Sequence, residues 1–426
     1  MRIATHTLGC KLNFAETSNL IRRFTDEGAE VVDFHQTADL YLVNTCTVTA
    51  IAEKKCRNII RQAHRQNGDA VIAVVGCFAQ NEAQRIAEIE GVNIVLGNHD
   101  KQRLKEVYDQ RLWDTSPNRC YVSSGFDPTS FDLSFSSGDR TRTFFKIQDG
   151  CDYFCTYCAI PFARGRSRSA TIAETLAVAH KIAATGAKEV VLTGINTGTF
   201  GKNHGETFFD LVKELDKIDG ILRYRISSIE PNLITDEIID FVAQSRSFLP
   251  HFHIPLQAGS DKVLKLMHRR YDTALYADKL RRIKQVMPHA CIAADIIAGF
   301  NGEGKQEFDE ACRFVEGLPI SYLHIFTYSE RPNTAALRMS EKVPMNVRRE
   351  RSRILHTISE QKKAQFYAEH EGEVRPVLWE SDHHDGYMMG FTDNYIRVRQ
   401  PFEEHDINRI TNIELNEATI VKTFEE

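Results

Sequence analysis

Phe144-Phe145-Lys146-Ile147-Gln148-Asp149-Gly150-Cys151-Asp152-Tyr153-Phe154-Cys155-Thr156-Tyr157-Cys158 is the stretch that decides the central part of this chain. It opens as an apolar, strand-like run, breaks at Gly150 and then presents three cysteines spaced C-x3-C-x2-C. Three thiolates without a fourth close by suit a cubic iron-sulfur cluster in which one iron is left open. An open iron can bind a small molecule, and a low-potential cluster can pass that molecule one electron.

Zinc and disulfides are the other uses of closely spaced cysteines. A structural zinc site usually takes two pairs of ligands, and no second cysteine pair follows Cys158 for more than a hundred residues. Disulfides require export, and the start of the chain shows no export signal. The spacing, with Tyr157 directly before the third cysteine, resembles the radical S-adenosylmethionine (SAM) superfamily. In that superfamily such a cluster reduces SAM and releases a 5'-deoxyadenosyl radical.

The composition is that of a globular protein of several domains. The chain has 426 residues, of which 42% are hydrophobic and 26% charged, and this length suits about three domains. No apolar run approaches the roughly 18 residues of a membrane span, so we expect a cytoplasmic protein without a membrane partner. In the reducing cytosol ten cysteines indicate metal binding or catalysis. The net charge of −5 does not favour general nucleic-acid binding, so phosphate contacts would come from local arginine clusters.

The N-terminal third alternates short apolar runs with helix-like segments, one of them from about Glu16, which is typical of a mostly parallel sheet covered by helices. Cys10, Cys46 and Cys77 each follow one of the apolar runs. Since the carboxyl ends of parallel strands meet at one edge, these thiols can converge on a second cubic cluster. The alternative is that each cysteine is a small buried hydrophobic residue. That alternative is the expectation for the four remaining cysteines, Cys56, Cys120, Cys291 and Cys312.

After a Ser-, Gly- and Pro-rich linker with a strand around Tyr121, strands and helices alternate again up to a last helix from about Asn333. With residues 144–147 this gives six strand-helix units, which predict a partial (β/α)6 barrel that is open on one side for a large substrate. Ligands of such barrels bind at the carboxyl ends of the strands. The candidate SAM-binding residues there are Tyr157, Gly194, Glu230, Gln257 and Asp295. Helix capping is the alternative use of the Asp and Gln side chains.

The C-terminal part changes from a helical to a strand period. Residues 345–367 predict one helix whose arginines either contact RNA or are simply solvated. Beyond Gly372 we expect five short strands, at residues 374–379, 386–391, 395–398, 407–413 and 418–423. They predict a small antiparallel β-barrel of a kind often used on nucleic acids. Residues 390–396 mix aromatic and amide side chains, which can stack on and bond to unpaired bases.

Together, the three scattered cysteines, the C-x3-C-x2-C motif and the terminal β module resemble the methylthiotransferases. These radical SAM enzymes have an N-terminal methylthiotransferase domain, a radical SAM barrel and a terminal TRAM domain. The resemblance covers nearly the whole chain. We therefore expect an N-terminal domain (1–112), a linker (113–143), the barrel (144–335), a helical connection (336–367) and a TRAM-like β module (368–426).

Five stretches, 147–151, 159–168, 227–231, 268–271 and 390–396, look most like one branch of this family. That branch adds a methylthio group to carbon 2 of N6-threonylcarbamoyladenosine beside the tRNA anticodon. Branches that act on N6-isopentenyladenosine in tRNA or on an aspartate of a ribosomal protein share both cysteine motifs. Outside the family, the alternative is a non-catalytic iron-sulfur protein that binds RNA.

The resemblance implies that Cys151, Cys155 and Cys158 hold the radical-generating 4Fe-4S cluster and that Cys10, Cys46 and Cys77 hold an auxiliary one. It also implies SAM as methyl donor and radical source, tRNA as substrate, and an electron donor such as a flavodoxin or ferredoxin. The candidate tRNA-binding residues are Arg164, Arg166, Arg168, Arg270, Asn394 and Tyr395.

Two features depart from the family pattern. Residues 299–304 lack the proline and threonine that are common after the fifth barrel strand. Residues 367–426 contain five Lys or Arg against fourteen Asp or Glu, which favours a few stacking contacts with tRNA over a broad charge-based grip.

Overall fold

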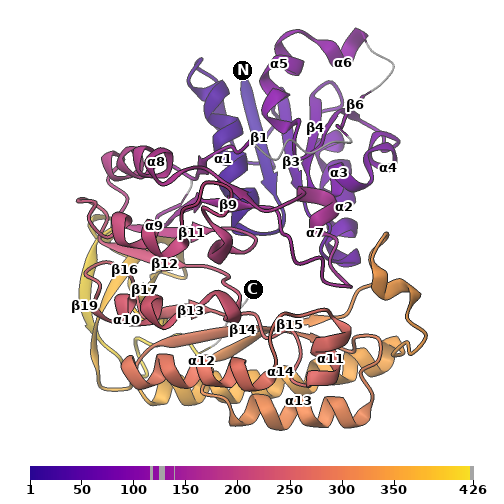
Figure 1. The fold of residues 1–426 in the computed structure, drawn as a ribbon. Coiled ribbons are helices and arrows are strands. Elements are labelled where there is room, and N and C mark those ends of the chain that lie inside the picture. The colour runs from indigo at the N-terminus through magenta and orange to yellow at the C-terminus, as the bar shows by residue number, and fades with distance from the viewer. Residues whose placement is uncertain (116–118, 124–129, 139, 423–426) are drawn as a thin grey trace. The chain divides into compact units, whose positions relative to one another are not determined.

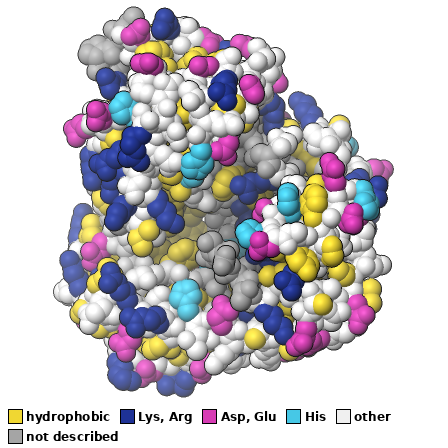
Figure 2. Space-filling view, turned by 180° about the vertical axis from the view of Figure 1, so that it is seen from behind, with side chains coloured by type: hydrophobic (Ala, Val, Ile, Leu, Met, Phe, Trp, Pro, Cys, Tyr) yellow, Lys and Arg dark blue, Asp and Glu magenta, His cyan; other side chains and the backbone are white. Residues whose placement is uncertain are grey.

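The computed structural model describes residues 1–115, 119–123, 130–138 and 140–422 (Figure 1). The chain divides into two compact units. The first contains Met1–Ser136, Phe144–Arg168 and Ser329–Leu337, and the second contains Ser137–Thr143, Ser169–Tyr328 and Arg338–Glu426. All six cysteines of the two predicted cluster sites therefore belong to the first unit. On the face drawn in Figure 2, Lys and Arg side chains are mixed with Asp and Glu.

The first unit is built on a six-stranded sheet of order β2-β1-β3-β4-β5-β6, in which every neighbouring pair is parallel. Its strands are β1 (Arg2–Thr7), β2 (Glu30–Val32), β3 (Leu40–Thr45), β4 (Val71–Gly76), β5 (Val92–Leu96) and β6 (Cys120–Tyr121). Its helical segments are α1 (Lys11–Thr25), α2 (Ala50–Gln66), α3 (Cys77–Asn81), α4 (Ala83–Ala87), η1 (Lys101–Arg103), α5 (Leu104–Asp109) and α6 (Leu112–Thr115). The parallel α/β sheet predicted from the sequence is confirmed.

Helices cover both faces of this sheet. Successive residues of a strand point to opposite faces, so Tyr41 and Val43 of β3 join a core with α2, whereas Leu40 and Leu42 join a core with α1 and α5. Every residue of β3 and β4 is buried, which explains why both strands consist of nearly continuous apolar runs.

Two local features of the first unit refine the sequence analysis. Helix α1 begins at Lys11 rather than near Glu16. The sequence does not mark this start, because the N-cap residue is Cys10, which makes no side-chain capping bond. The strand expected around Tyr121 is present as β6, and it pairs with β5 as the last strand of the sheet. Part of the predicted linker therefore belongs to the N-terminal sheet.

The rest of the first unit surrounds the C-x3-C-x2-C motif. Strands β7 (Ser134–Phe135) and β8 (Thr143–Lys146) pair antiparallel, and β9 (Gln148–Asp149) leads into Cys151. The motif is followed by α7 (Ile160–Arg164) and β10 (Arg168–Ser169). The distant segment Ser329–Leu337 joins this region, where the Ala336 N–H donates to the carbonyl oxygen of Thr156 at 2.8 Å.

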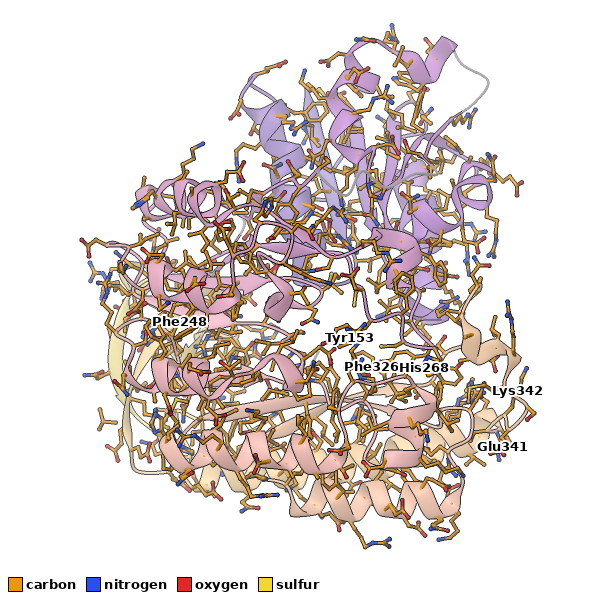
Figure 3. All side chains as sticks on the ribbon, viewed as in Figure 1. Tyr153, Phe248, His268, Phe326, Glu341 and Lys342 are labelled. Atoms are coloured by element: carbon orange, nitrogen blue, oxygen red, sulfur yellow. The ribbon has the colours of Figure 1, made fainter. Side chains whose placement is uncertain are left out.

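The second unit contains the other strands of the partial barrel. They are β11 (Glu189–Thr193), β12 (Arg223–Ile226), β13 (His251–His253), β14 (Cys291–Ala298) and β15 (Tyr322–Thr327). Strand β11 pairs parallel with β12, and β13, β14 and β15 form a parallel sheet in that order. Tyr224 of β12 and Phe248 (Figure 3) form a single parallel bridge and stack their rings with centroids 5.0 Å apart. With β8, all six predicted barrel strands are present.

The helical segments of this barrel region are α8 (Ile172–Ala184), η2 (Thr197–Thr199), α9 (Phe208–Leu215), η3 (Pro231–Leu233), α10 (Asp236–Gln244), α11 (Asp261–Leu266), α12 (Thr273–Val286) and α13 (Lys305–Gly317). Thr171, Thr207 and Thr235 cap α8, α9 and α10 by accepting a backbone N–H at their side-chain oxygens. The helix expected from Asn333 is wrong. Asn333 has a φ of +65°, which is incompatible with a right-handed helix, and only the 3-10 turn η4 (Ala335–Arg338) follows.

The second unit ends with a long helix, α14 (Met345–Ala368), as predicted, and an antiparallel sheet of order β18-β17-β16-β19. Its elements are β16 (Val374–His384), β17 (Tyr387–Thr392), β18 (Arg397–Pro401), η5 (Glu404–Asp406) and β19 (Ile410–Glu414). The fifth strand expected at residues 418–423 is instead a single bridge between Ile420 and Val398, and residue 423 lies outside the described residues.

The core of this terminal sheet is centred on Trp379, which is fully buried. Phe366 and Tyr367, at the end of α14, join the same core, so the helix is packed against the sheet that follows it. No helix among the described residues is both long and apolar enough to cross a membrane.

Candidate functional site

Three cysteines lie at the carboxyl ends of three neighbouring strands of the first unit. Cys10 follows β1 and caps α1, Cys46 follows β3, and Cys77 begins α3 directly after β4. Because β1, β3 and β4 are adjacent in the sheet, these strand ends lie side by side. A Cβ atom at Gly9 would lie 3.2 Å from the Sγ of Cys46, so the loop that carries Cys10 packs directly against Cys46.

Gly76 fixes the direction of Cys77. It has a φ of +102°, and a Cβ atom at this position would lie 2.6 Å from the carbonyl oxygen of Thr45. Glycine adopts this left-handed conformation without steric cost and allows the close approach of the two backbones. The tight turn from β4 into α3 therefore places Cys77 beside the end of β3.

The thiols of this first triad act on one another. Burial first, and then the neighbouring thiols of Cys77 and Cys10, raise the pKa of Cys46 to about 12. Cys10 keeps exposed surface as a residue, but desolvation raises the pKa of its thiol as well. A bound metal deprotonates such thiols, since the thiolate is the ligand. Three thiols at neighbouring strand ends are the kind of ligand that iron-sulfur clusters use.

The C-x3-C-x2-C triad lies in a loop that is held from both sides. Cys151 donates its N–H to the carbonyl oxygen of Gly165 at 3.0 Å, and the Cys158 N–H donates to the carbonyl oxygen of Cys155 at 3.0 Å. Gly150 has a φ of +69°, and any Cβ atom there would collide with the carbonyl group of Arg166. The cysteine loop is thus fixed against the segment that follows α7.

Six buried charged side chains, which we call the buried charge group, connect the segments that carry the two triads. They are Glu16, Lys101, Lys146, Asp149, Arg164 and Arg168. Glu16 lies on α1 behind Cys10, and its carboxylate is 2.6 Å from the Nζ of Lys101 and 2.8 Å from that of Lys146. Burial alone would raise the pKa of Glu16, but Arg164 and these two lysines outweigh it and hold the pKa well below its usual value.

Asp149 is the second carboxylate of the buried charge group. It lies two residues before Cys151, and its oxygens are 2.9 Å from Lys146 Nζ, 3.0 Å from Arg164 Nη1 and 3.3 Å from Arg168 Nη2. Burial would raise the pKa of Asp149, but the charges of Lys146, Arg164 and Arg168 lower it well below the usual value.

The predicted tRNA contacts of Arg164 and Arg168 are wrong for this structure. The Arg164 side chain has no exposed surface, and the Arg168 side chain is only 8% exposed. Both guanidinium groups are occupied by carboxylates and backbone carbonyls inside the first unit. Arg166, between them, is different: its side chain is 67% exposed and lies over the ring of Phe154 at 4.7 Å.

The predicted SAM-binding residues are divided between the two units. Tyr157 is half-buried in the cysteine loop of the first unit. Gly194 and Glu230 follow β11 and β12 in the second unit, and Glu230 is paired with Arg269. Burial raises the pKa of Glu230 although the Arg269 charge opposes this effect. Gln257 has a φ of +65°, and its N–H donates to the carbonyl oxygen of Asp295 at 2.8 Å.

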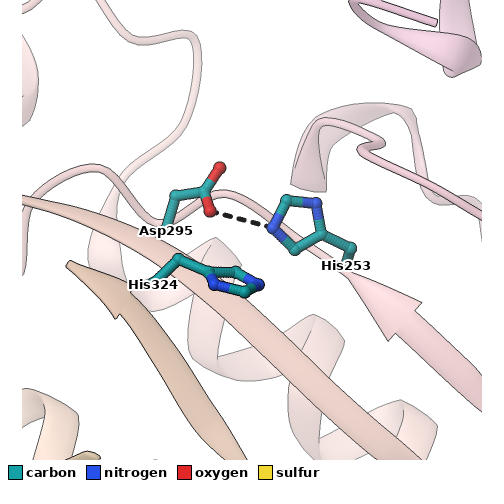
Figure 4. A group of neighbouring side chains, drawn as sticks. All are labelled: His253, Asp295 and His324. Carbon is teal, nitrogen blue, oxygen red and sulfur yellow. Dashed lines mark hydrogen bonds and ion pairs between the residues drawn. The ribbon is translucent and has the colours of Figure 1, made fainter. Parts of the chain in front are cut away.

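Asp295 belongs to a polar cluster formed by three neighbouring strands (Figure 4). Its Oδ1 is 2.9 Å from the Nε2 of His253 on β13, and the other ring nitrogen of His253 is 2.7 Å from the Ser228 hydroxyl. His324 of β15 completes the cluster, in which the ligand-type atoms of the three residues lie within 4.8 Å of one another.

The other predicted tRNA contacts lie in the second unit. Arg270 is exposed. Asn394 has no exposed surface, because its amide accepts from the Thr392 hydroxyl and donates to the carbonyl oxygen of His289. The Tyr395 ring stacks with His251 at 4.2 Å and with Phe391 at 4.6 Å. Asn394 is therefore not available to unpaired bases in this structure, whereas the base contact of Tyr395, which keeps part of its surface exposed, stays a prediction.

The buried charge group was missed in the sequence. Its signal was present in the motif itself, where Lys146 and Asp149 interrupt an apolar run three residues apart. Their partner Glu16 lies 130 residues before Lys146, on a helix whose start the sequence did not mark.

Comparison with known proteins identifies the family. Residues 2–97 match the Uncharacterized protein family UPF0004, and residues 145–315 match the Radical SAM superfamily. The threonylcarbamoyladenosine tRNA methylthiotransferase MtaB of Bacillus subtilis is 39% identical to this chain, and the match covers 100% of the chain and 97% of the relative. This chain belongs to the radical SAM methylthiotransferase family.

Further relatives agree with this assignment. The enzyme of the same name from Aquifex aeolicus is 36% identical to this methylthiotransferase over 94% of its chain and 97% of the relative. The tRNA-2-methylthio-N(6)-dimethylallyladenosine synthase of Bacillus subtilis is 31% identical over 97% of the chain and 83% of the relative. Membership implies a radical SAM domain, which uses a 4Fe-4S cluster and SAM.

A solved structure shares the fold of the methylthiotransferase. The radical S-adenosylmethionine methyltransferase TsrM from Kitasatospora setae matches with a TM-score of 0.59 and 15% identity, over 79% of this chain and 76% of that chain. This likeness supports the α/β architecture with a radical SAM partial barrel.

Proposed function

We propose that this methylthiotransferase adds a methylthio group to carbon 2 of N6-threonylcarbamoyladenosine next to the tRNA anticodon. The observation that carries the proposal is the 39% identity, over the whole chain, to the threonylcarbamoyladenosine tRNA methylthiotransferase MtaB of Bacillus subtilis. The dimethylallyladenosine synthase of that organism is 31% identical. The alternative substrate is therefore the isopentenyl (dimethylallyl) adenosine of tRNA, and the test must distinguish it from N6-threonylcarbamoyladenosine.

The two cysteine triads are proposed to hold two 4Fe-4S clusters. Cys151, Cys155 and Cys158 would hold the radical-generating cluster, and Cys10, Cys46 and Cys77 a second one. The shared sheet edge supports the second site, and so do the raised pKa values of Cys10 and Cys46, which follow first from burial and then from neighbouring thiols. When bound, these groups and SAM supply the electron, the radical, the methyl group and the sulfur that the reaction needs.

The residues of the chain hold and orient these groups. The left-handed backbone at Gly150 and the tight turn at Gly76 present one cysteine of each triad at a fixed position. Because a misplacement of about 1 Å can cost a factor of 100 in rate, such rigid loops are needed for radical transfer to one carbon atom.

SAM binding is proposed for the polar groups at the carboxyl ends of the barrel strands and in the cysteine loop. These groups are Tyr157, Gly194, Glu230, Gln257 and Asp295. The Asp295 carboxylate is fixed by His253 but remains 18% exposed, and Glu230 is 11% exposed beside Arg269. Each carboxylate therefore keeps surface for an ammonium or ribose hydroxyl group.

Binding of tRNA is proposed for the exposed arginines, Arg166 and Arg270. Basic and acidic side chains are mixed on the face in Figure 2, which fits recognition by a few contacts. We further propose a cytoplasmic site of action, where tRNA and an electron donor such as a flavodoxin or ferredoxin are available.

Deletion of the gene tests the substrate. We expect that the tRNA of the deletion strain loses 2-methylthio-N6-threonylcarbamoyladenosine and accumulates its unthiolated precursor, as measured by mass spectrometry of nucleosides. The wild-type gene should restore the modified nucleoside, and a Cys155→Ala gene should not. Loss of the methylthiolated isopentenyladenosine instead would favour the alternative, and unchanged levels of both nucleosides would end the proposal.

A further inference from the structure

The buried charge group has more positive than negative charges. It contains four cations, Lys101, Lys146, Arg164 and Arg168, and two carboxylates, Glu16 and Asp149. All six side chains are at most 8% exposed. Uncompensated charge is costly in a protein interior unless a further group of opposite sign is bound. This excess of buried cations therefore suits an anionic ligand.

Within the buried charge group, Arg164 is the cation that lies toward Cys10, Cys46 and Cys77. Its Nη2 donates to Asn13 Oδ1 at 2.7 Å, and the Cys10 Sγ lies 3.9 Å from the same oxygen. Asn98 makes a second link: its Nδ2 donates to the carbonyl oxygen of Ala163 at 2.7 Å and lies 3.5 Å from the Sγ of Cys77. The amide side chains of Asn13 and Asn98 thus lie between the end of α7 and the thiols of Cys10 and Cys77.

The Arg164 guanidinium also has a spare donor. Its Nε is buried and has no hydrogen-bond partner among the described residues, although the other nitrogens of the group are bonded to Glu16, Asp149 and Asn13. A buried guanidinium N–H without an acceptor is costly. Glu16, whose carboxylate oxygens accept from Arg164 Nη1 and Nη2 at 3.1 Å each, brings the opposite charge to the same place.

We propose that Arg164 is a positioning residue for the second cluster, whose negative charge it offsets and whose reduction potential it raises. This inference rests on the proposed function, because it requires a cluster on Cys10, Cys46 and Cys77. Three thiolates make such a cluster anionic, and reduction adds one more negative charge. A buried cation with a free N–H stabilises the reduced form more than the oxidised form, so the potential rises.

The proposal couples the two cluster sites through the chain itself. Arg164 is the last residue of α7, which begins two residues after Cys158. The segment that follows the C-x3-C-x2-C motif therefore supplies the cation beside Cys10, Cys46 and Cys77. Asp149, on the other side of the same motif, holds Arg164 Nη1 at 3.0 Å. Arg164 is thus held by Glu16, Asp149 and Asn13, and none of these contacts uses a thiol of the C-x3-C-x2-C motif.

The test measures the second cluster alone in the full-length protein. In a Cys151→Ala, Cys155→Ala, Cys158→Ala background, reconstituted with iron and sulfide under anaerobic conditions, a potentiometric titration is followed by electron paramagnetic resonance. Adding Arg164→Gln should move the potential to more negative values. Adding Glu16→Gln, which removes a negative charge from the same group, should move it to more positive values. Arg166→Gln, two residues away and exposed, is the matched control and should leave it unchanged.

The opposite signs separate an electrostatic role from a structural one. Shifts in the same direction for Arg164→Gln and Glu16→Gln, or no shift in either, would overturn the inference. If Arg164→Gln loses its iron, Arg164→Lys and Glu16→Gln decide. The lysine variant keeps the positive charge, so it should retain iron at a potential close to that of the background and below that of Glu16→Gln, and a Glu16→Gln shift to negative values would refute the proposal. If the triple-alanine background takes up no iron, the second cluster is removed from the proposed function as well. If it takes up iron but the Arg164 and Glu16 variants leave the potential unchanged, this inference alone is overturned.

Discussion

Glu189 is the centre of the contact between the barrel and the terminal sheet within the second unit, and its replacement by glutamine gives a sharp stability test. The carboxylate accepts from Arg225 Nε at 2.7 Å and Nη2 at 3.3 Å, and it lies 3.6 Å from Arg223 Nη1. The same guanidinium groups donate to the carbonyl oxygens of Thr392 at 2.7 Å and Pro376 at 2.8 Å. Glu189 thus fixes the two arginines that hold the terminal sheet.

The size of the effect follows from burial. Glu189 is fully buried, and both arginines are at most 4% exposed. Removal of one partner from a buried ion pair typically costs about 3–5 kcal/mol, and because the glutamine oxygen can still accept one hydrogen bond we expect about 3 kcal/mol. For a unit of this size that corresponds to a fall in the melting temperature of roughly 6–12 °C.

The loss of stability in Glu189→Gln should become smaller as the pH falls. Burial alone would raise the pKa of Glu189, but the charges of Arg225 and Arg142 outweigh it and lower the pKa. A carboxyl group whose pKa is lowered by folding stabilises the protein above its unfolded pKa of about 4.3, and this contribution is lost as the pH falls through the folded pKa. The difference between wild type and Glu189→Gln should therefore be constant from pH 8 to pH 5 and shrink below about pH 4.3.

Trp379 provides the assay. It is fully buried in the terminal sheet, so in a Trp113→Phe background the chain's remaining tryptophan reports urea unfolding of that region. Glu214→Gln, which removes a partly exposed partner of Lys217, is the control and should cost less than about 1 kcal/mol. A Glu189→Gln loss below about 1 kcal/mol at pH 7, or a loss that stays constant down to pH 3, would refute the reasoning.

The remaining predictions concern the cysteine loops. Cys155→Ala should abolish 5'-deoxyadenosine formation, whereas Cys46→Ala should leave this product unchanged and stop methylthio insertion. Both products are measured by mass spectrometry. A Cys46→Ala variant that still thiolates tRNA would contradict the second cluster site. Cys312→Ala, which removes a half-buried thiol on α13 in the second unit, should leave iron content and both products unchanged. Gly150→Ala places a side chain at a φ of +69° against a backbone carbonyl, so it should lower the iron content by about half under the two-cluster assignment, while Gly68→Ala, with its nearest atom 4.0 Å away, should not.

The sequence predicted the elements better than the partners of individual side chains. Strand and helix positions follow from local periodicity, so the parallel sheet, the six barrel strands and α14 were all expected. The position of Cys10, Cys46 and Cys77 at one edge of the sheet was also predictable, because parallel strands end at a common edge. The exceptions, near Asn333 and residue 420, lie where backbone conformation rather than period decides.

The arginines after the motif show what local patterns cannot reveal. A cluster such as Arg164-Gly165-Arg166 is typical of a phosphate contact, but Arg164 meets Glu16, which lies 148 residues earlier in the chain. Whether a charge is solvated or buried depends on such distant partners, which no local pattern reports. The same holds for Tyr395, whose ring is covered by His251 from another strand.

Product analysis with purified protein tests the central claim most directly. The reconstituted, reduced enzyme is incubated with SAM and, in separate reactions, with tRNA that carries N6-threonylcarbamoyladenosine or N6-isopentenyladenosine. We predict 2-methylthio-N6-threonylcarbamoyladenosine from the first tRNA and no methylthiolated nucleoside from the second. Formation of 5'-deoxyadenosine without any methylthiolated nucleoside, or thiolation of only the isopentenyladenosine tRNA, would contradict the account.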